Sequence, residues 1–318
     1  MASSAKSALC CEQLNATKVL EAQFDPLRLF IEDPAVTDLM VNADGSVWID
    51  KAGDVSYTSV SLSVPHRLSI IRELAGLYGL VCTRDSPTLA CRLPGFWCTG
   101  RVQAVIPPIS DGPELCIRFP SRTKLTLEDL VGKGMLTRAQ AKRLNRLVMS
   151  RCNGVIAGGT GSGKTTLLVA LLDLIENERL GIIEDTPEVF LNNKNTFYWQ
   201  TNPTFSARDA VKTSLRYRPD RIILGEVRDG AATLEWLKAS STGHPGSVCT
   251  IHANSAAAVH NRMYALMQEE VVTPSNDLIN DASDYVVYVE KTINNRNRKV
   301  VRKVQEILTS KSSKETSL

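Results

Sequence analysis

One segment constrains the fold of this chain more than any other: the eight residues from Gly158 to Thr165. They read Gly-Gly-Thr-Gly-Ser-Gly-Lys-Thr and satisfy the pattern G-x-x-x-x-G-K-[ST] in full. An apolar, strand-like segment precedes them, and a helix-length segment follows. A glycine-rich loop between a strand and a helix is the context in which this pattern binds phosphate. The segment therefore predicts a P-loop domain of the α/β class.

The residue types of this loop suit a nucleotide. Glycines let backbone N–H groups turn inward around phosphate oxygens, and the start of the following helix adds about half a positive charge. Lys164 is expected to reach the β- and γ-phosphates, and Thr165 to bind Mg²⁺. We therefore predict ATP and Mg²⁺ as ligands. The residues expected to contact ATP are Gly159, Thr160, Gly161, Ser162, Gly163, Lys164, Thr165 and Thr166.

The sequence around the loop predicts the rest of its domain. Three short apolar segments, residues 155–157, 181–184 and 221–224, are separated by helix-length stretches. This alternation is typical of βα units that form a mostly parallel sheet. Thr137 and Gln140 form a capping-box pattern before an amphipathic helix that ends near residue 151. We therefore predict a nucleotide-binding domain over residues 127–318.

The N-terminal part of the chain has a different pattern. Strand-like segments and a helix that opens at Pro65 are mixed over residues 1–119, which predicts a smaller α+β domain. The polar and basic segment 120–126 is the predicted linker between the two domains. The expected strands of the first domain cover residues 36–41, 47–49, 102–106 and 115–119.

Charge and hydropathy limit the classes of function. The chain has 318 residues and a formal net charge of +3, which is too small to indicate sequence-specific nucleic-acid binding. No segment has the roughly 20 apolar residues that a membrane helix needs, and the N-terminus lacks the apolar core of a signal peptide. We therefore expect a cytoplasmic protein. From Lys291 to Leu318 there are eight basic and two acidic residues, which predicts a basic tail that either contacts a membrane surface or is simply solvated.

Several strand ends carry residues suited to catalysis. Glu226 follows an apolar strand, and it is our candidate for polarising the attacking water, although an exposed strand-end carboxylate is the alternative. P-loop proteins usually place an aspartate here, but the preceding residue is Gly225. Glu184 begins an acidic run at another strand end, where acids can orient Mg²⁺ waters. His252 is a candidate γ-phosphate sensor, and a structural role is the alternative for it and for His244.

Four motifs follow one another along the chain: GGTGSGKT at 158–165, IIEDTPE at 182–188, RIILGEVR at 221–228 and TGHPGSVCTIHA at 242–253. In this order they resemble the Walker A, Asp box, Walker B and His box of the secretion ATPase superfamily, which serves type II secretion, type IV pili and type IV secretion including conjugation. The resemblance implies a RecA-like domain, ATP hydrolysis and a homohexameric ring. It also implies catalytic roles for Glu184, Glu226 and His252, and the lack of an aspartate before Glu226 is a trait of the superfamily.

The segment 33–48, DPAVTDLMVNADGSVW, is similar to conjugal-transfer ATPases of the TrbB type. In that family, arginines of the N-terminal domain approach the nucleotide, and the matching residues here are Arg101 and Arg118. The resemblance implies a motor for type IV secretion or conjugative transfer. It also implies inner-membrane channel components as partners and a peripheral place at the cytoplasmic face of the inner membrane.

Three alternatives remain open. The first is an ATPase of type II secretion or pilus assembly; type II members usually carry a four-cysteine zinc insertion after the His box, which this sequence lacks. The second is a DNA translocase, which would carry a basic stripe with interleaved aromatic residues. The third is a nucleotide-binding scaffold without hydrolysis, against which the presence of Lys164, Thr165 and Glu226 argues.

Overall fold

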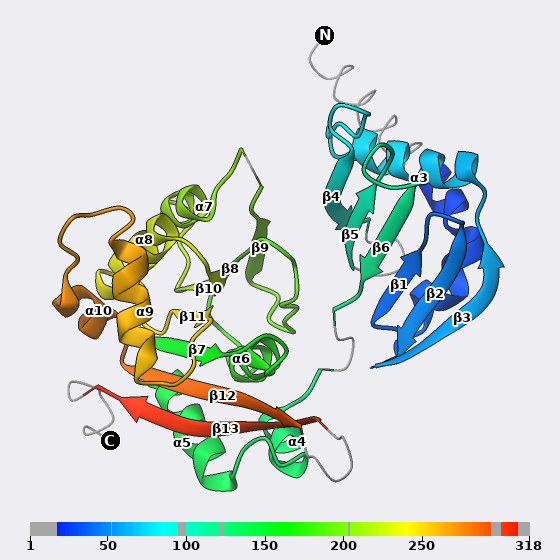
Figure 1. The fold of residues 1–318 in the computed structure, drawn as a ribbon. Helices are drawn as coiled ribbons and strands as arrows, with labels where there is room; N and C mark the ends of the chain where they lie inside the picture. Colours follow the sequence, from blue (N-terminus) through cyan, green and yellow to red (C-terminus); the bar gives the residue numbers. More distant parts are fainter. Residues whose placement is uncertain are drawn as a thin grey trace. The chain divides into compact units, whose positions relative to one another are not determined.

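The structure is a computed structural model that describes residues 18–51, 53–94, 100–120, 124–202, 204–293 and 300–310. The chain divides into two compact units, Met1–Thr123 and Lys124–Leu318. Each is described here by itself, and Figure 1 shows the elements of both. The boundary between the units falls inside the segment 120–126.

The first unit contains an antiparallel sheet with the strand order β3-β2-β1-β6-β5-β4. Helix α3 (Val64–Leu77) packs its apolar side on one face of this sheet, and the side chain of Ser63 caps its first turn. The predicted α+β class is confirmed, but β3 and β4 were not expected. Besides η1 (Asp25–Leu27) and α2 (Arg28–Glu32), the elements are β1 (Asp38–Val41), β2 (Ser46–Lys51), β3 (Asp54–Ser61), β4 (Thr88–Leu93), β5 (Gly100–Val105) and β6 (Glu114–Arg118).

The second unit is built on a seven-stranded sheet with the order β13-β12-β7-β11-β10-β8-β9. Among the described residues every neighbouring pair is parallel except β12 with β13. The predicted mostly parallel sheet is therefore confirmed. The strands are β7 (Gly154–Gly158), β8 (Leu180–Glu184), β9 (Thr196–Gln200), β10 (Arg221–Val227), β11 (Val248–Ile251), β12 (Tyr285–Ile293) and β13 (Val300–Thr309).

Helices cover both faces of this sheet, as Figure 1 shows. The apolar side chains of the sheet accordingly divide between two cores, one on each face. The predicted capping box is present, because Thr137 and Gln140 exchange side-chain and backbone hydrogen bonds at the start of α5. One face packs against α4 (Leu127–Gly132), α5 (Arg138–Met149) and α6 (Lys164–Leu172), and the other against α7 (Ala207–Ser214), α8 (Gly230–Ser241), α9 (Ala258–Met267) and α10 (Asn276–Ala282).

The basic tail expected from Lys291 onward is not a tail over its described residues. Lys291 to Ile293 end β12, and residues 300–309 form β13, which pairs with the whole length of β12. Apolar side chains explain this result, since Val304 is buried and Ile307 packs against the core. Residues 294–299 and 311–318 lie outside the described part of the chain. The sequence did not predict this strand because most of its side chains are exposed and they show no regular alternation with buried ones.

Candidate active site

The predicted catalytic residues of the second unit meet at one edge of its sheet. Strands β7, β11, β10 and β8 are neighbours and parallel, so their carboxyl ends lie together. The phosphate loop follows β7, Glu184 ends β8, Glu226 lies near the end of β10 and His252 follows β11. Ligands of open α/β sheets bind in the crevice outside these carboxyl ends.

The phosphate loop has the backbone and charge that an anion requires. Gly161 and Gly163 have φ values of +69° and +98°, which side-chain-bearing residues rarely adopt. The Lys164 ammonium is buried and lies 3.0 Å from the carbonyl oxygens of Gly158 and Gly159. Burial lowers the pKa of Lys164, and the carboxylates of two nearby glutamates oppose this effect. The buried hydroxyl of Ser162 has no hydrogen-bond partner within the described residues. This donor set fits a bound phosphate chain.

Thr165 has the surroundings expected of a magnesium ligand. Its hydroxyl lies 2.9 Å from a carboxylate oxygen of Glu188. Mg²⁺ prefers oxygen ligands, commonly one or two carboxylates together with phosphate oxygens. Thr165 and Glu188 therefore fit Mg²⁺. Glu188 was not a candidate ligand in the sequence analysis, although its place in the acidic run that follows β8 was the available signal.

The absence of an aspartate before Glu226 has a steric explanation. The side chain of Glu184 crosses from β8 to β10, and a Cβ atom on Gly225 would lie 2.6 Å from its Cγ atom. Glu184 itself is buried and accepts hydrogen bonds from the backbone N–H groups of Glu188 and Val189, at 3.1 and 3.2 Å. A carboxylate from β8 thus occupies the space that an aspartate at position 225 would need. Burial raises the pKa of Glu184 to about 8.

This raised pKa predicts a pH-dependent stability. An ordinary glutamate has a pKa of 4.5, so between that value and about 8 the folded chain keeps a proton that the unfolded chain has lost. The free energy of unfolding therefore falls as pH rises through this window and levels off above it. Between pH 6 and 8 the Glu184 contribution should fall by about 2 kcal/mol, and Glu184→Gln should remove it. Urea unfolding without nucleotide measures this, and equal pH slopes for both proteins would contradict the assignment.

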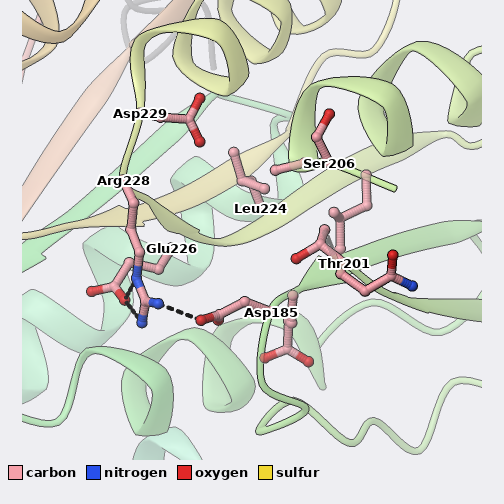
Figure 2. A pocket seen from close by; sticks show the side chains of 11 residues that line it. Asp185, Thr201, Ser206, Leu224, Glu226, Arg228 and Asp229 are labelled. Atoms are coloured by element: carbon pink, nitrogen blue, oxygen red, sulfur yellow. Dashed lines mark hydrogen bonds and ion pairs between the residues drawn. The ribbon is translucent and has the colours of Figure 1, made fainter. Parts of the chain in front are cut away.

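Glu226 is held by two basic side chains. The register between β10 and β11 shifts between Leu224 and Val227, and such irregularities re-aim side chains beside active sites. One carboxylate oxygen of Glu226 lies 2.6 Å from Nε2 of His252. The other accepts from Nε of Arg228 at 2.6 Å, and Arg228 also pairs with Asp185 (Figure 2). Glu226, Arg228 and Asp185 border a pocket of about 310 Å³. Arg228 was missed in the sequence because its pairing with Asp185 depends on strand order.

The two candidate histidines lie at opposite ends of β11. His252 follows the carboxyl end and contacts Glu226. His244 precedes the amino end, where Nδ1 lies 3.0 Å from the carbonyl oxygen of Pro219. The structure thus brings only His252 to the phosphate-loop edge of the sheet. The position of His244, away from the phosphate loop, agrees with the alternative that this histidine has a structural role.

The first unit places the candidate arginines in a row. Arg118 of β6 lies opposite Arg101 of β5, which in turn lies opposite Arg92 of β4. On its other side Arg118 faces Asp38 of β1, with 2.8 Å between Nε and the carboxylate. The side chains of Arg101 and Arg118 are exposed, while Ile117 beside them points into the core. Like charges directly opposite each other destabilise a sheet, so this row is a candidate for binding an anion.

The parallel sheet, the phosphate loop and the strand-end acids together define a P-loop domain of the RecA-like type. Comparison with known proteins then identifies the family. Residues 21–315 match the family described as type II/IV secretion system protein. The chain belongs to this family, and the resemblance to secretion ATPases drawn from its four motifs is confirmed.

Individual relatives agree with this assignment. The chain is 35% identical over 281 residues to the probable conjugal transfer protein TrbB of Sinorhizobium fredii, covering 86% of this chain and 85% of that protein. It is 31% identical over 294 residues to the type IV secretion system protein VirB11 of Bartonella henselae, covering 79% and 82%. The fold is also that of the Legionella pneumophila ATPase DotB, with a TM-score of 0.60, 19% identity and 89% and 79% coverage. Within the described residues, no helix is long and apolar enough to span a membrane.

Proposed function

We propose that this chain hydrolyses ATP at the carboxyl edge of its parallel sheet and thereby drives type IV secretion or conjugative transfer. One observation carries the proposal: Glu226 of β10 contacts His252, which follows β11, and β11 lies beside the strand that leads into a complete phosphate loop. The buried Lys164 provides the cation for the β- and γ-phosphates. Relatives whose names refer to conjugal transfer and type IV secretion support the assignment to this kind of machine.

Each residue has a distinct role in the proposed reaction. The loop N–H groups and Lys164 hold the phosphate chain, and the residues that would hold Mg²⁺ are Thr165 and Glu188. When bound, Mg²⁺ neutralises charge on the β- and γ-phosphate oxygens. Glu226 accepts the proton of the attacking water. His252 orients the Glu226 carboxylate through their 2.6 Å contact and reads the γ-phosphate. Glu184 supports the loop that carries Glu188 through two backbone hydrogen bonds.

His252→Ala should lower ATP turnover more than ATP affinity. The imidazole contacts Glu226, so its loss should misplace the carboxylate. The expected loss of turnover is about a hundredfold, the lower limit of the range for general-base catalysis. His244→Ala is a matched control, because this histidine precedes the same strand at the opposite sheet edge. Steady-state hydrolysis and equilibrium ATP binding measure both effects. Unchanged turnover in His252→Ala would remove this histidine from the mechanism.

We further propose that six copies form a ring with head-to-tail contacts, as the family resemblance implies. Such a ring would dock on inner-membrane channel components at the cytoplasmic face of the membrane and associate with the membrane only peripherally. Native mass spectrometry with and without ATP and Mg²⁺ should detect a species of six times 34.9 kDa. A monomer under every nucleotide condition would contradict the ring. Complementation of a conjugation-deficient strain then separates transfer from pilus assembly.

A further inference from the structure

The hairpin of β12 and β13 reaches past the sheet to the phosphate loop. Strand β12 pairs with β7 as far as Val289, which lies opposite Gly158 where the loop begins. Because β12 continues for four more residues, Lys291 lies beyond the last pair, on the side of the loop. Arg302 of β13 is the residue directly opposite Lys291. The hairpin therefore presents two cations at the loop, and none of the sequence motifs includes either of them.

Both side chains lie close to glycines of the loop. The Nε atom of Arg302 donates a hydrogen bond of 2.9 Å to the carbonyl oxygen of Gly161. A Cβ atom on Gly161 would lie 3.5 Å from Nζ of Lys291, and one on Gly163 would lie 3.4 Å from Cδ of Arg302. Arg302 thus fixes the orientation of a peptide carbonyl within the phosphate loop, and Lys291 places its ammonium beside the same glycine.

The rest of β13 holds Arg302 in this position. The N–H of Val304 donates to the carbonyl oxygen of Met135 at 2.8 Å, and the Gln140 side chain donates to the carbonyl of Val304 at 3.0 Å. Arg143 reaches the carbonyl oxygen of Ile307 at 3.1 Å. Strand β13 is therefore tied to the α4–α5 turn and to α5. A group held on a rigid element in this way is positioned before its ligand binds.

The two neighbouring positive charges of Lys291 and Arg302 favour the binding of an anion. Like charges directly opposite each other on neighbouring strands destabilise a hairpin. In the part of the chain that the structure describes, no carboxylate forms an ion pair with Lys291 or Arg302. Arg302 is exposed, so its guanidinium is open to a ligand as well as to the loop. An anion bound at the neighbouring phosphate loop would offset the repulsion.

We propose that Arg302 and Lys291 are part of the nucleotide site, a pair that we term the cationic rim. Arg302 is a positioning residue: by binding the Gly161 carbonyl it keeps that oxygen outside the loop, so that the loop N–H groups face the phosphates. The rest of its guanidinium and the Lys291 ammonium bind the phosphate chain of the nucleotide. The inference rests on the proposed binding of ATP by this loop.

Arg302→Ala and Lys291→Ala test the rim in the full-length protein. Arg302→Ala removes a charged hydrogen bond to the loop, and each of the two variants removes one cation. The dissociation constants of ATP and ADP with Mg²⁺ should therefore each rise about tenfold or more. Arg302→Lys should recover part of the affinity because it keeps the charge. Lys303→Ala is the matched control, since this exposed neighbour of Arg302 lies opposite Glu290 of β12 in the hairpin register and not opposite Lys291. Isothermal titration gives the affinities, and the thermal midpoint without nucleotide reports the fold.

The outcomes separate the rim from the proposed function. Weaker ATP and ADP binding in both alanine variants, with a thermal midpoint like that of Lys303→Ala, supports the rim. ATP affinity unchanged in Arg302→Ala overturns it, and so does an affinity loss that only accompanies a lower thermal midpoint. If neither the wild-type protein nor Lys303→Ala binds ATP, the result contradicts the proposed ATPase function itself and not only the role of the cationic rim.

Discussion

Glu226→Gln is expected to lower ATP turnover by about 10² to 10⁴-fold while ATP stays bound, because general-base catalysis contributes that much. The amide has nearly the shape of the carboxylate but cannot accept the proton of the attacking water. It also loses the charge that pairs with Arg228. Phosphate release and equilibrium ATP binding measure the two effects separately. Turnover within tenfold of wild type would mean that Glu226 is not the base.

Lys164→Ala is the contrasting variant at the same site. It removes the buried cation of the phosphate loop, so we expect both ATP binding and turnover to be abolished. The two variants therefore fail for different reasons, one in binding and the other in chemistry. If Lys164→Ala and Glu226→Gln lost turnover with the same ATP affinity, the separate roles of the two residues would be contradicted.

The sequence predicted the strands whose pattern is local. Strands β7, β8 and β10 are buried on both faces, so each is a short apolar run that stands out between helical segments. The helix α5 was predicted because its capping box lies within four residues. By contrast, β3 and β13 lie at sheet edges, where most side chains are exposed and no alternation marks a strand.

The residues of the candidate site likewise fall into two groups: those that local motifs predicted and those that only the tertiary structure brings together. Its phosphate loop and strand-end acids were predicted because each motif lies within a few neighbouring residues. The contact of Glu184 with Gly225 could not be predicted, because it requires the knowledge that β8 and β10 are neighbours. Likewise, Arg302 is 141 residues from Gly161 in the chain, and only the pairing of β12 with β7 and β13 brings the two together. Local patterns thus indicate the chemistry, while tertiary pairing supplies the residues that position it.

The second large loss of ATP turnover is expected from substitutions in the arginine row of the first unit. We propose, from the family resemblance, that Arg101 and Arg118 approach the γ-phosphate during turnover. Their position on one exposed sheet face is compatible with this role. The ion pair of Arg118 with Asp38 does not oppose it, since Arg118 is 71% exposed and surface pairs contribute about 0 to 1 kcal/mol. A triphosphate is therefore able to compete for the guanidinium.

Arg101→Ala and Arg118→Ala are expected to keep most of their ATP affinity and to lose at least about a hundredfold in turnover. An arginine that stabilises charge developing in the transition state contributes about 10³ to 10⁵ in rate, and neighbouring Arg92 is placed to replace part of the loss. Arg72→Ala is the control, because Arg72 is exposed on α3, which covers the opposite, apolar face of the sheet.

Conjugative transfer should fail together with turnover in both arginine variants. An arginine that binds the γ-phosphate only before hydrolysis would couple each turnover to rigid-body motion of the first unit, which we propose as the mechanical output. Hydrolysis rates, ATP affinity and transfer frequency, measured on the same variants, test the coupling. Wild-type turnover in both single variants would leave the first unit as a docking module. Lost transfer with intact hydrolysis would instead place the arginines in the coupling step alone.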